Sequence, residues 1–374
     1  MATSVLIAGG GVGGLEAALA LQALAGERVE LTLLAPERHF TYRPLAVAEP
    51  FGGPLMLRFP LRTFAEDRGL CLVRDAVAAV EPDGRRVHTQ GGETLPYDVL
   101  LLATGARALE AVPGALTFRG PRDAKQMREL VDAVCDGTVA DLAFVVPPGA
   151  TWTLPLYELA LATAVAARAA GVAARLCVVT SERAPLEIFG PEASAEVAEL
   201  LAAHEVALHT ERSVREVADG QLWMPMEGSL AADRVVALPT LAGRRIPGVP
   251  ADERNFTPVD AFGRVRRLEH VYAVGDGADH PLKQGGLAAQ QADVAAASIA
   301  ATLGVGVAPA PYGPVLRSVL LTGDGVRYLR SGGAGGPAEV TDRAPWWPGA
   351  KIAGRHLAPY LAAHLADAEV PAVA

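Results

Sequence analysis

A glycine-rich turn near the start of the sequence is the first candidate for chemistry. Residues 4–9 (SVLIAG) form a short apolar run of buried-strand type, and an alanine-rich helical pattern follows. Between them, Gly9, Gly11 and Gly14 have the spacing of a dinucleotide-binding fingerprint. The first glycine permits a tight turn, the second lets backbone approach a pyrophosphate, and the third allows close packing of helix and strand. The pattern predicts phosphate binding at the positive end of the helix, and the alternative is a turn without ligand.

The second predicted strand, residues 29–34, should be followed by an acid that binds a ribose diol. Ala35 occupies the usual position of that acid, and Glu37 comes two residues later. We expect Glu37, with its neighbour Arg38, to contact the nucleotide through a wider turn. The alternative for Glu37 is a solvated turn residue.

Two further strand ends carry conspicuous motifs. Residues 98–106 (DVLLLATGA) form an apolar strand closed by Ala-Thr-Gly, and residues 271–277 (VYAVGDG) form a strand closed by Gly-Asp. A loop and a long helical pattern follow the second strand. Taken in this order and at this wide spacing, the fingerprint and the two strand ends resemble flavoproteins with two dinucleotide-binding domains, the superfamily of pyridine nucleotide-disulfide oxidoreductases. The sequence is most similar there to type II NADH dehydrogenases and sulfide:quinone oxidoreductases, up to about residue 330, and the resemblance implies bound FAD.

The resemblance also implies roles for individual residues. Thr104 and Gly105 would pass close to FAD, and Val77 would bind adenine through its backbone. Asp276 would accept hydrogen bonds from the ribityl chain, since a buried carboxylate without such a partner is costly. The loop HFTYRPL, with Arg43 and Pro44, resembles the segment beside the isoalloxazine ring.

The stretch before the long helix is the predicted site of flavin tuning. It includes Lys283, Gln284 and Gly286, and in the resembling family this helix start points at the pyrimidine edge of the flavin. Negative charge develops there on reduction, so helix N–H groups and the Lys283 ammonium would stabilise the reduced form. We therefore predict Lys283 as the catalytic residue. The alternative is a lysine in a solvent-exposed loop.

The middle of the chain keeps a βαβ rhythm but loses the nucleotide-binding turn. After the predicted strand that ends at Val146 the sequence reads PPGATWT, where a glycine triad would be expected. Prolines lack N–H groups and tryptophan is bulky, so this turn is a poor pyrophosphate cradle. Tight binding of NAD(P)H is therefore disfavoured.

The cysteines also depart from the resembling family. Sulfide:quinone oxidoreductases relay electrons through cysteines that flank the flavin, one of them in this loop. Here the loop has Thr151, Trp152 and Thr153, and no cysteine follows Cys177. Sulfide oxidation by a disulfide relay is therefore not expected.

Three functions remain open. The first is an FAD-dependent oxidoreductase that moves two electrons from a small-molecule donor to a quinone or similar acceptor. The second is an NAD(P)H:acceptor oxidoreductase with a non-standard nicotinamide site, in which Glu158 or Glu182 replaces the usual contacts. The third is a catalytically idle FAD protein that acts as a redox sensor or scaffold. The donor, the acceptor and the oligomeric state are not specified by the sequence.

The elements that position these residues predict an α/β fold. The chain of 374 residues is 51% hydrophobic and 20% charged, which is typical of globular proteins. We expect two Rossmann-like domains, the second inserted into the first, and a small C-terminal region. Residues 1–110 and 251–310 would form the FAD-binding domain, 111–250 the second domain, and 311–374 the C-terminal region.

Net charge and cysteine content narrow the partners and the compartment. A net charge of −9 disfavours a nucleic-acid partner, which needs a basic surface. Three cysteines are too few for a disulfide scaffold and indicate a reducing cytoplasm. The histidines show no metal-binding spacing.

The C-terminal region has two possible roles. Trp346 and Trp347 precede a short helical pattern with Leu357, Tyr360, Leu361 and Leu365 on one face. Such a stripe would suit peripheral contact with the inner face of a membrane. The alternative is that it packs on the core or on a second copy of the chain.

Overall fold

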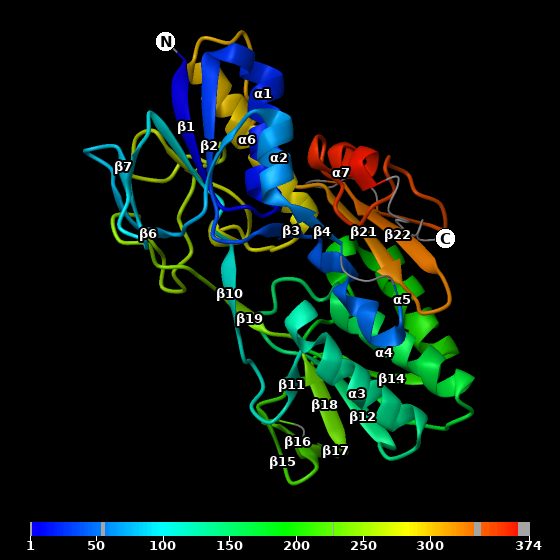
Figure 1. Cartoon of the computed structure of the whole chain (residues 1–374). Helices are drawn as coiled ribbons and strands as arrows, with labels where there is room; N and C mark the ends of the chain where they lie inside the picture. The colour runs from blue at the N-terminus through cyan, green and yellow to red at the C-terminus, as the bar shows by residue number, and fades with distance from the viewer. Residues whose placement is uncertain (1, 54–56, 227, 333–337, 366–374) are drawn as a thin grey trace.

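The structure is a computed structural model that describes residues 2–53, 57–226, 228–332 and 338–365. Its N-terminal part is built on a parallel sheet in the order β20-β9-β1-β2-β5. The strands are β1 (Thr3–Ala8), β2 (Val29–Leu34), β5 (Cys71–Val73), β9 (Val99–Leu102) and β20 (Val271–Ala273). The late strand β20 pairs with β9, so the chain returns to the first sheet after building a second one (Figure 1).

Both faces of the first sheet are buried, because alternate residues of a strand point to opposite sides. Val5 and Ile7 belong to a core with the helices, whereas Leu6 and Ala8 belong to a separate core on the other face. The helical layer contains α1 (Val12–Ala25), α2 (Leu61–Arg68), α6 (Gly285–Thr302) and α7 (Leu357–Leu365). The opposite layer includes a small antiparallel sheet of β6 (Val77–Glu81), β7 (Arg86–Thr89) and β8 (Thr94–Pro96).

The second parallel sheet has the order β11-β18-β12-β13-β14. Its strands are β11 (Leu116–Thr117), β12 (Asp141–Val146), β13 (Arg175–Thr180), β14 (Val206–His209) and β18 (Arg234–Ala237). One face is covered by α3 (Ala124–Cys135), α4 (Leu154–Ala169) and α5 (Pro191–Ala203), and the other by β15 (Glu216–Ala218), β16 (Gln221–Met224) and β17 (Gly228–Ala231). The antiparallel pair β10 (Ala106–Leu109) and β19 (Thr240–Gly243) runs between the two sheets (Figure 1).

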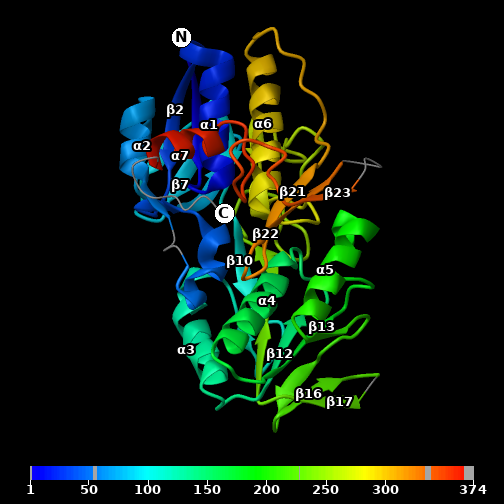
Figure 2. The same cartoon turned by 90° about the vertical axis from the view of Figure 1, so that its right-hand side faces the viewer.

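The C-terminal region bridges these two bodies. Its antiparallel sheet of β21 (Leu316–Leu321), β22 (Val326–Ser331) and β23 (Ala338–Thr341) lies against α4, α5 and α6 (Figure 2). The chain then returns to the first sheet, where α7 packs beside α1. The remaining elements are β3 (His39–Thr41), β4 (Arg58–Pro60) and the short 3-10 helices η1 (Gly26–Arg28), η2 (Arg43–Val47), η3 (Glu49–Phe51), η4 (Pro121–Asp123), η5 (Glu187–Phe189) and η6 (Gly275–Gly277).

The predicted α/β class with two Rossmann-like sheets is confirmed. The apolar stripe of the tail packs on the core in this structure, because Leu357, Tyr360 and Leu361 are buried among residues of the first helical layer. The side chain of Leu365 lies outside the described residues. None of the helices in the described residues combines the length and the apolar composition that a membrane-spanning helix requires.

Candidate functional site

The predicted glycine fingerprint forms a tight turn between β1 and α1. Gly9 has φ +127°, and a Cβ atom there would lie 2.2 Å from the carbonyl oxygen of Ala103. A Cβ on Gly14 would lie 1.9 Å from the carbonyl oxygen of Gly9. A Cβ on Gly11 would meet no heavy atom of the described residues within 4 Å. Two glycines are therefore required by packing, whereas Gly11 borders open space at the helix N-terminus.

Three strand ends converge beside this turn. Gly9 touches the backbone at Ala103, directly before Thr104 and Gly105. A Cβ on Gly277 would lie 3.2 Å from the carbonyl oxygen of Gly105. The structure therefore brings the three predicted motifs together at the carboxyl edge of the first sheet, where ligands of open α/β sheets bind.

A half-buried carboxylate, Asp276, lies at this edge. Among the described residues it has no hydrogen-bond partner. Burial raises the pKa of Asp276, while the positive charges of Lys283 and Arg43 oppose that rise. A carboxylate in this state has unused capacity to accept hydrogen bonds.

Lys283 is buried, so the alternative of a solvent-exposed lysine is wrong. Its side chain is 5% exposed, its Nζ donates to the carbonyl oxygen of Ala278, and it lies 4.0 Å from the centre of the Phe256 ring. Burial lowers the pKa of Lys283 to about 8, against the attraction of Asp276 and other carboxylates. Near pH 8, Lys283 is therefore present both as the charged ammonium and as the neutral amine.

The start of α6 is fixed by its cap residue. The Gln284 side chain accepts from the backbone N–H of Leu287 at 2.9 Å and donates to the carbonyl of Arg317 at 3.0 Å. A Cβ on Gly286 would lie 2.9 Å from the Gln284 side-chain oxygen. Gln284 and Gly286 thus have a structural function at the helix start.

The other predicted contact residues lie farther along these loops. Glu37 and Arg38 occupy the exposed turn between β2 and β3, and Val77 is half-buried at the first position of β6. Arg43 and Pro44 begin η2. Among the described residues, no hydrogen bond or ion pair joins Glu37 or Val77 to the glycine turn, so their predicted roles depend on a bound nucleotide.

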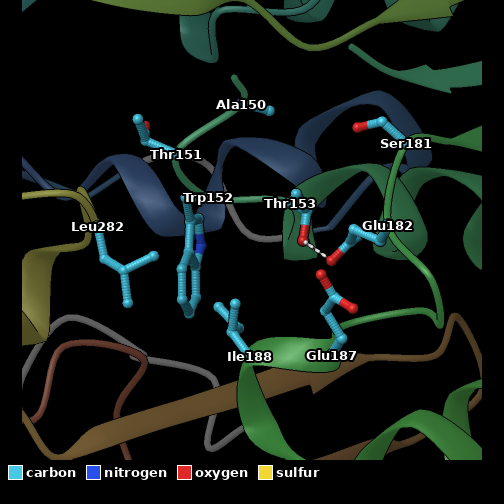
Figure 3. A pocket seen from close by; sticks show the side chains of 9 residues that line it. All are labelled: Ala150, Thr151, Trp152, Thr153, Ser181, Glu182, Glu187, Ile188 and Leu282. Atoms are coloured by element: carbon cyan, nitrogen blue, oxygen red, sulfur yellow. Dashed lines mark hydrogen bonds between the residues drawn. The ribbon is translucent and has the colours of Figure 1, made fainter. Parts of the chain in front are cut away.

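A second crevice lies at the carboxyl edge of the second sheet. Its lining comes from the turn after β12, from the residues after β13, from η5 and from Leu282, and it encloses about 190 Å³ (Figure 3). Trp152, Ile188 and Leu282 form an apolar side, and Thr153, Glu182 and Glu187 lie on the polar side. The Trp152 ring contacts Phe189 edge-on, with 5.8 Å between ring centres.

A buried ion pair joins the tail to both sheets, and sequence reasoning did not find it. Lys351 Nζ lies 2.5 Å from Glu158 Oε1 and 3.3 Å from the carbonyl oxygen of Pro44. Glu158 Oε1 also accepts from the backbone of Leu321 at 2.8 Å, while Oε2 is buried without a partner among the described residues. The rarity of lysine in this arginine-rich chain was the available signal, since it applies to Lys351 as it does to Lys283.

The three cysteines of this chain do not form a disulfide pair that could replace the redox cysteines of the resembling enzymes. Cys71, Cys135 and Cys177 are free, and burial raises the pKa of the Cys177 thiol to about 11. In the described part of the chain, no group of three or more metal-ligand side chains is arranged to bind a metal ion.

The family model for pyridine nucleotide-disulphide oxidoreductases matches residues 3–298. The chain belongs to this family. Membership places it among flavin-dependent oxidoreductases. An NADH dehydrogenase-like protein of Mycobacterium tuberculosis is 27% identical to this oxidoreductase over 293 residues, which are 73% of this chain and 72% of that protein.

Solved structures show the same architecture. The sulfide:quinone oxidoreductase of Aquifex aeolicus superposes with a TM-score of 0.82 at 17% identity, covering 91% of this chain and 87% of that one. A ferredoxin reductase of Rhodopseudomonas palustris has a TM-score of 0.68 at 21% identity, covering 89% and 83%. At these identities the likeness shows the fold alone. The predicted resemblance to sulfide:quinone oxidoreductases and NADH dehydrogenases is confirmed.

Proposed function

We propose that this oxidoreductase binds FAD at the carboxyl edge of its first sheet and passes two electrons from a small-molecule donor to a quinone. The observation that carries the proposal is the convergence of Gly9, Thr104, Gly105 and Gly277 beside the unsatisfied carboxylate of Asp276. The residues present fit the cofactor. When bound, FAD would supply the two-electron carrier that the protein side chains lack.

The chain's own residues have distinct tasks in this proposal. The open space at Gly11 and the N-terminus of α1 receive the pyrophosphate, because N–H groups and the helix dipole attract anions. Asp276 accepts from hydroxyl groups of the cofactor. Glu37, Arg38 and the Val77 backbone contact the adenosine half. Arg43 and Pro44 would contact the isoalloxazine ring of FAD, and the start of α6 at Gln284 and Gly286 would direct backbone N–H groups toward that ring.

Lys283 supplies positive charge near the ring. Its ammonium is held by Ala278 and by the Phe256 ring, so it is already positioned before charge develops. A preorganised cation stabilises a developing anion without further reorganisation. This supports Lys283 as the residue that favours the reduced cofactor.

The likeness to a sulfide:quinone oxidoreductase over 91% of the chain motivates the quinone as acceptor. The tail residues between β23 and α7 lie against both sheets and leave Trp347 78% exposed. Peripheral contact with a membrane, where quinones dissolve, is a further part of the proposal and would use this exposed tryptophan.

NAD(P)H is the second candidate donor, because the mycobacterial relative is named as NADH dehydrogenase-like.

The proposed quinone acceptor can be tested without knowledge of the electron donor. The FAD-loaded protein is reduced anaerobically with dithionite, freed of excess reductant, and mixed with a soluble quinone. We expect complete reoxidation at one quinone per flavin. Reoxidation by one-electron carriers but not by quinone would refute the proposed acceptor.

A further inference from the structure

The chain's own side chains occupy part of the crevice of the second sheet. Glu182 follows β13, the strand next to β12, and an acid after the second strand of a Rossmann fold binds the ribose of a dinucleotide. Here that carboxylate is 9% exposed. It accepts from Thr153 Oγ1 at 3.0 Å, Tyr157 OH at 2.6 Å and Thr180 Oγ1 at 3.0 Å. The hydroxyl groups of the protein thus take the place that ribose hydroxyls would occupy.

The turn after β12 has other residues at positions where fingerprint glycines would bind phosphates. In the first sheet the fingerprint glycines stand one, three and six residues after the strand end at Ala8. The same count from Val146 reaches Pro147, Gly149 and Trp152. Two of three positions are therefore changed, and Trp152 fills the space beside Leu282 and Ile188 (Figure 3).

Size and charge also disagree with a dinucleotide. The hollow of about 190 Å³ is smaller than the roughly 300–1,000 Å³ of pockets that enclose drug-sized ligands. Its lining includes Glu182 and Glu187 but no lysine or arginine. Glu187 is paired with Arg183 at 3.1 Å, but Arg183 lies outside the lining, so the lining itself presents no cation to a pyrophosphate.

This crevice lies next to the proposed flavin site. The carbonyl oxygen of Thr151 accepts from the backbone N–H of Lys283 at 3.4 Å, and Leu282 lines the hollow. The turn that excludes a dinucleotide is thus held against the segment that precedes α6. A small molecule in the hollow would lie beside this segment.

We propose that Trp152 and the inward-turned Glu182 close this crevice to NAD(P)H, so that the electron donor is a small molecule without phosphate groups. Glu182 is a positioning residue here. Its bond to Thr153 fixes the residue after Trp152, and so fixes the indole in the dinucleotide's place. The inference deepens the proposed function and rests on its flavin for the kinetic readout.

The test compares two hydride donors on the FAD-loaded protein under anaerobic conditions. NADH carries the pyrophosphate and riboses, whereas 1-benzyl-1,4-dihydronicotinamide carries neither. We expect the benzyl compound to reduce the flavin at least 100-fold faster than NADH or NADPH at equal concentration. Equal or faster reduction by NADH or NADPH would overturn the inference. Quinone reoxidation of dithionite-reduced protein is scored separately, so failure of the proposed acceptor is distinguishable.

A variant pair tests the residues. Pro147→Gly with Trp152→Gly restores glycine at all three fingerprint positions, and we expect NADH-dependent flavin reduction to rise at least 10-fold. Adding Glu182→Ala should not reduce that gain, because Thr153, Tyr157 and Thr180 hold this carboxylate inside the crevice, where it helps to exclude the dinucleotide. FAD content and the rate with the benzyl compound report whether each variant is folded. A folded glycine variant without gain, or a gain that Glu182→Ala abolishes, would contradict the assignment.

Discussion

Among single residues, Gly14 is required for folding, whereas Gly11 is expected to be required for ligand binding. A Cβ on Gly14 would collide with backbone at 1.9 Å, whereas one on Gly11 meets open space. We expect Gly14→Ala to lower the free energy of unfolding by more than about 2 kcal/mol, since overpacking against backbone cannot relax. Gly11→Ala should change it by less than about 1 kcal/mol and yet weaken FAD binding at least 10-fold. Urea denaturation and FAD titration of both variants measure this, and equal behaviour would contradict it.

Lys283 provides the second prediction at this scale. We expect Lys283→Met to lower the two-electron potential of the bound flavin by about 30 mV, roughly 1.4 kcal/mol, because a partly buried cation near the developing charge is lost. The exposed Lys125 on α3 is the matched control. Because burial lowers the pKa of Lys283 to about 8, the wild type loses its ammonium as pH rises through 8. The difference from the methionine variant should shrink there. An unchanged potential at pH 7 would remove Lys283 from the flavin site.

The first turn was predictable, because the strand pattern, the three spaced glycines and the helical pattern follow one another directly in the sequence. Glu37 was predicted from its position after the second strand and Val77 from the family resemblance, and both stay predictions. The hydrogen bonds of Glu182 were not predictable, because Thr153, Tyr157 and Thr180 come together only when β12, α4 and β13 are packed.

At the scale of elements, α7 is held by a side chain of another helix. The buried Glu16 of α1 accepts from the backbone N–H groups of His356 and Leu357, both at 2.7 Å. Asp293 of α6 lies beside it, 3.8 Å from the ring of His356. Burial and the charge of Glu16 raise the pKa of Asp293 to about 7, while Arg355 opposes the rise. Below pH 7, the carboxyl group of Asp293 is therefore mostly protonated, so Glu16 and Asp293 together carry fewer than two negative charges at the start of α7.

This arrangement predicts that α7 loosens as pH rises. The folded pKa of Asp293 is above its ordinary value, so its stabilising contribution is complete in acid and is lost as pH rises through about 7. We expect the α7 amides to exchange faster, relative to an Asp293→Asn variant at the same pH, at pH 8 than at pH 6. A constant ratio of the two exchange rates would contradict this.

The main strands and helices were predicted well because their apolar runs are continuous, as in β1, β9 and β12. The sequence did not specify what α7 packs against, because an apolar stripe is compatible with both a membrane surface and a protein core. Burial of Tyr360 between Phe59 and Phe64, at 5.7 Å and 5.2 Å between ring centres, resolves it for the described residues.

At the scale of the whole molecule, Lys351 ties the tail to both sheets through Glu158 and the Pro44 carbonyl. Removing one partner leaves a buried charge unpaired, which costs about 3–5 kcal/mol. We expect Lys351→Met to lower the free energy of unfolding by that amount, and Lys351→Met with Glu158→Leu to recover at least half of it. Chemical denaturation of both variants measures this. A double variant no more stable than the single one would contradict this, because the unpaired Glu158 carboxylate would then carry no cost.

The fold class and the order of motifs were predictable because the first sheet concentrates its motifs at strand ends. The long-range ties were not, since Lys351 and Glu158 are 193 residues apart. Their pairing depends on how the tail crosses between the two sheets, which no local pattern specifies.

In the proposed function, this chain is a flavoprotein whose flavin lies where the three strand ends meet. Titration of cofactor-free protein with FAD tests it most directly, with fluorescence quenching of the flavin as readout and Gly11→Ala as the folded control. We predict saturation at one FAD per chain for the wild type and binding at least 10-fold weaker for the variant. Absence of saturable binding to the folded wild type would contradict the account.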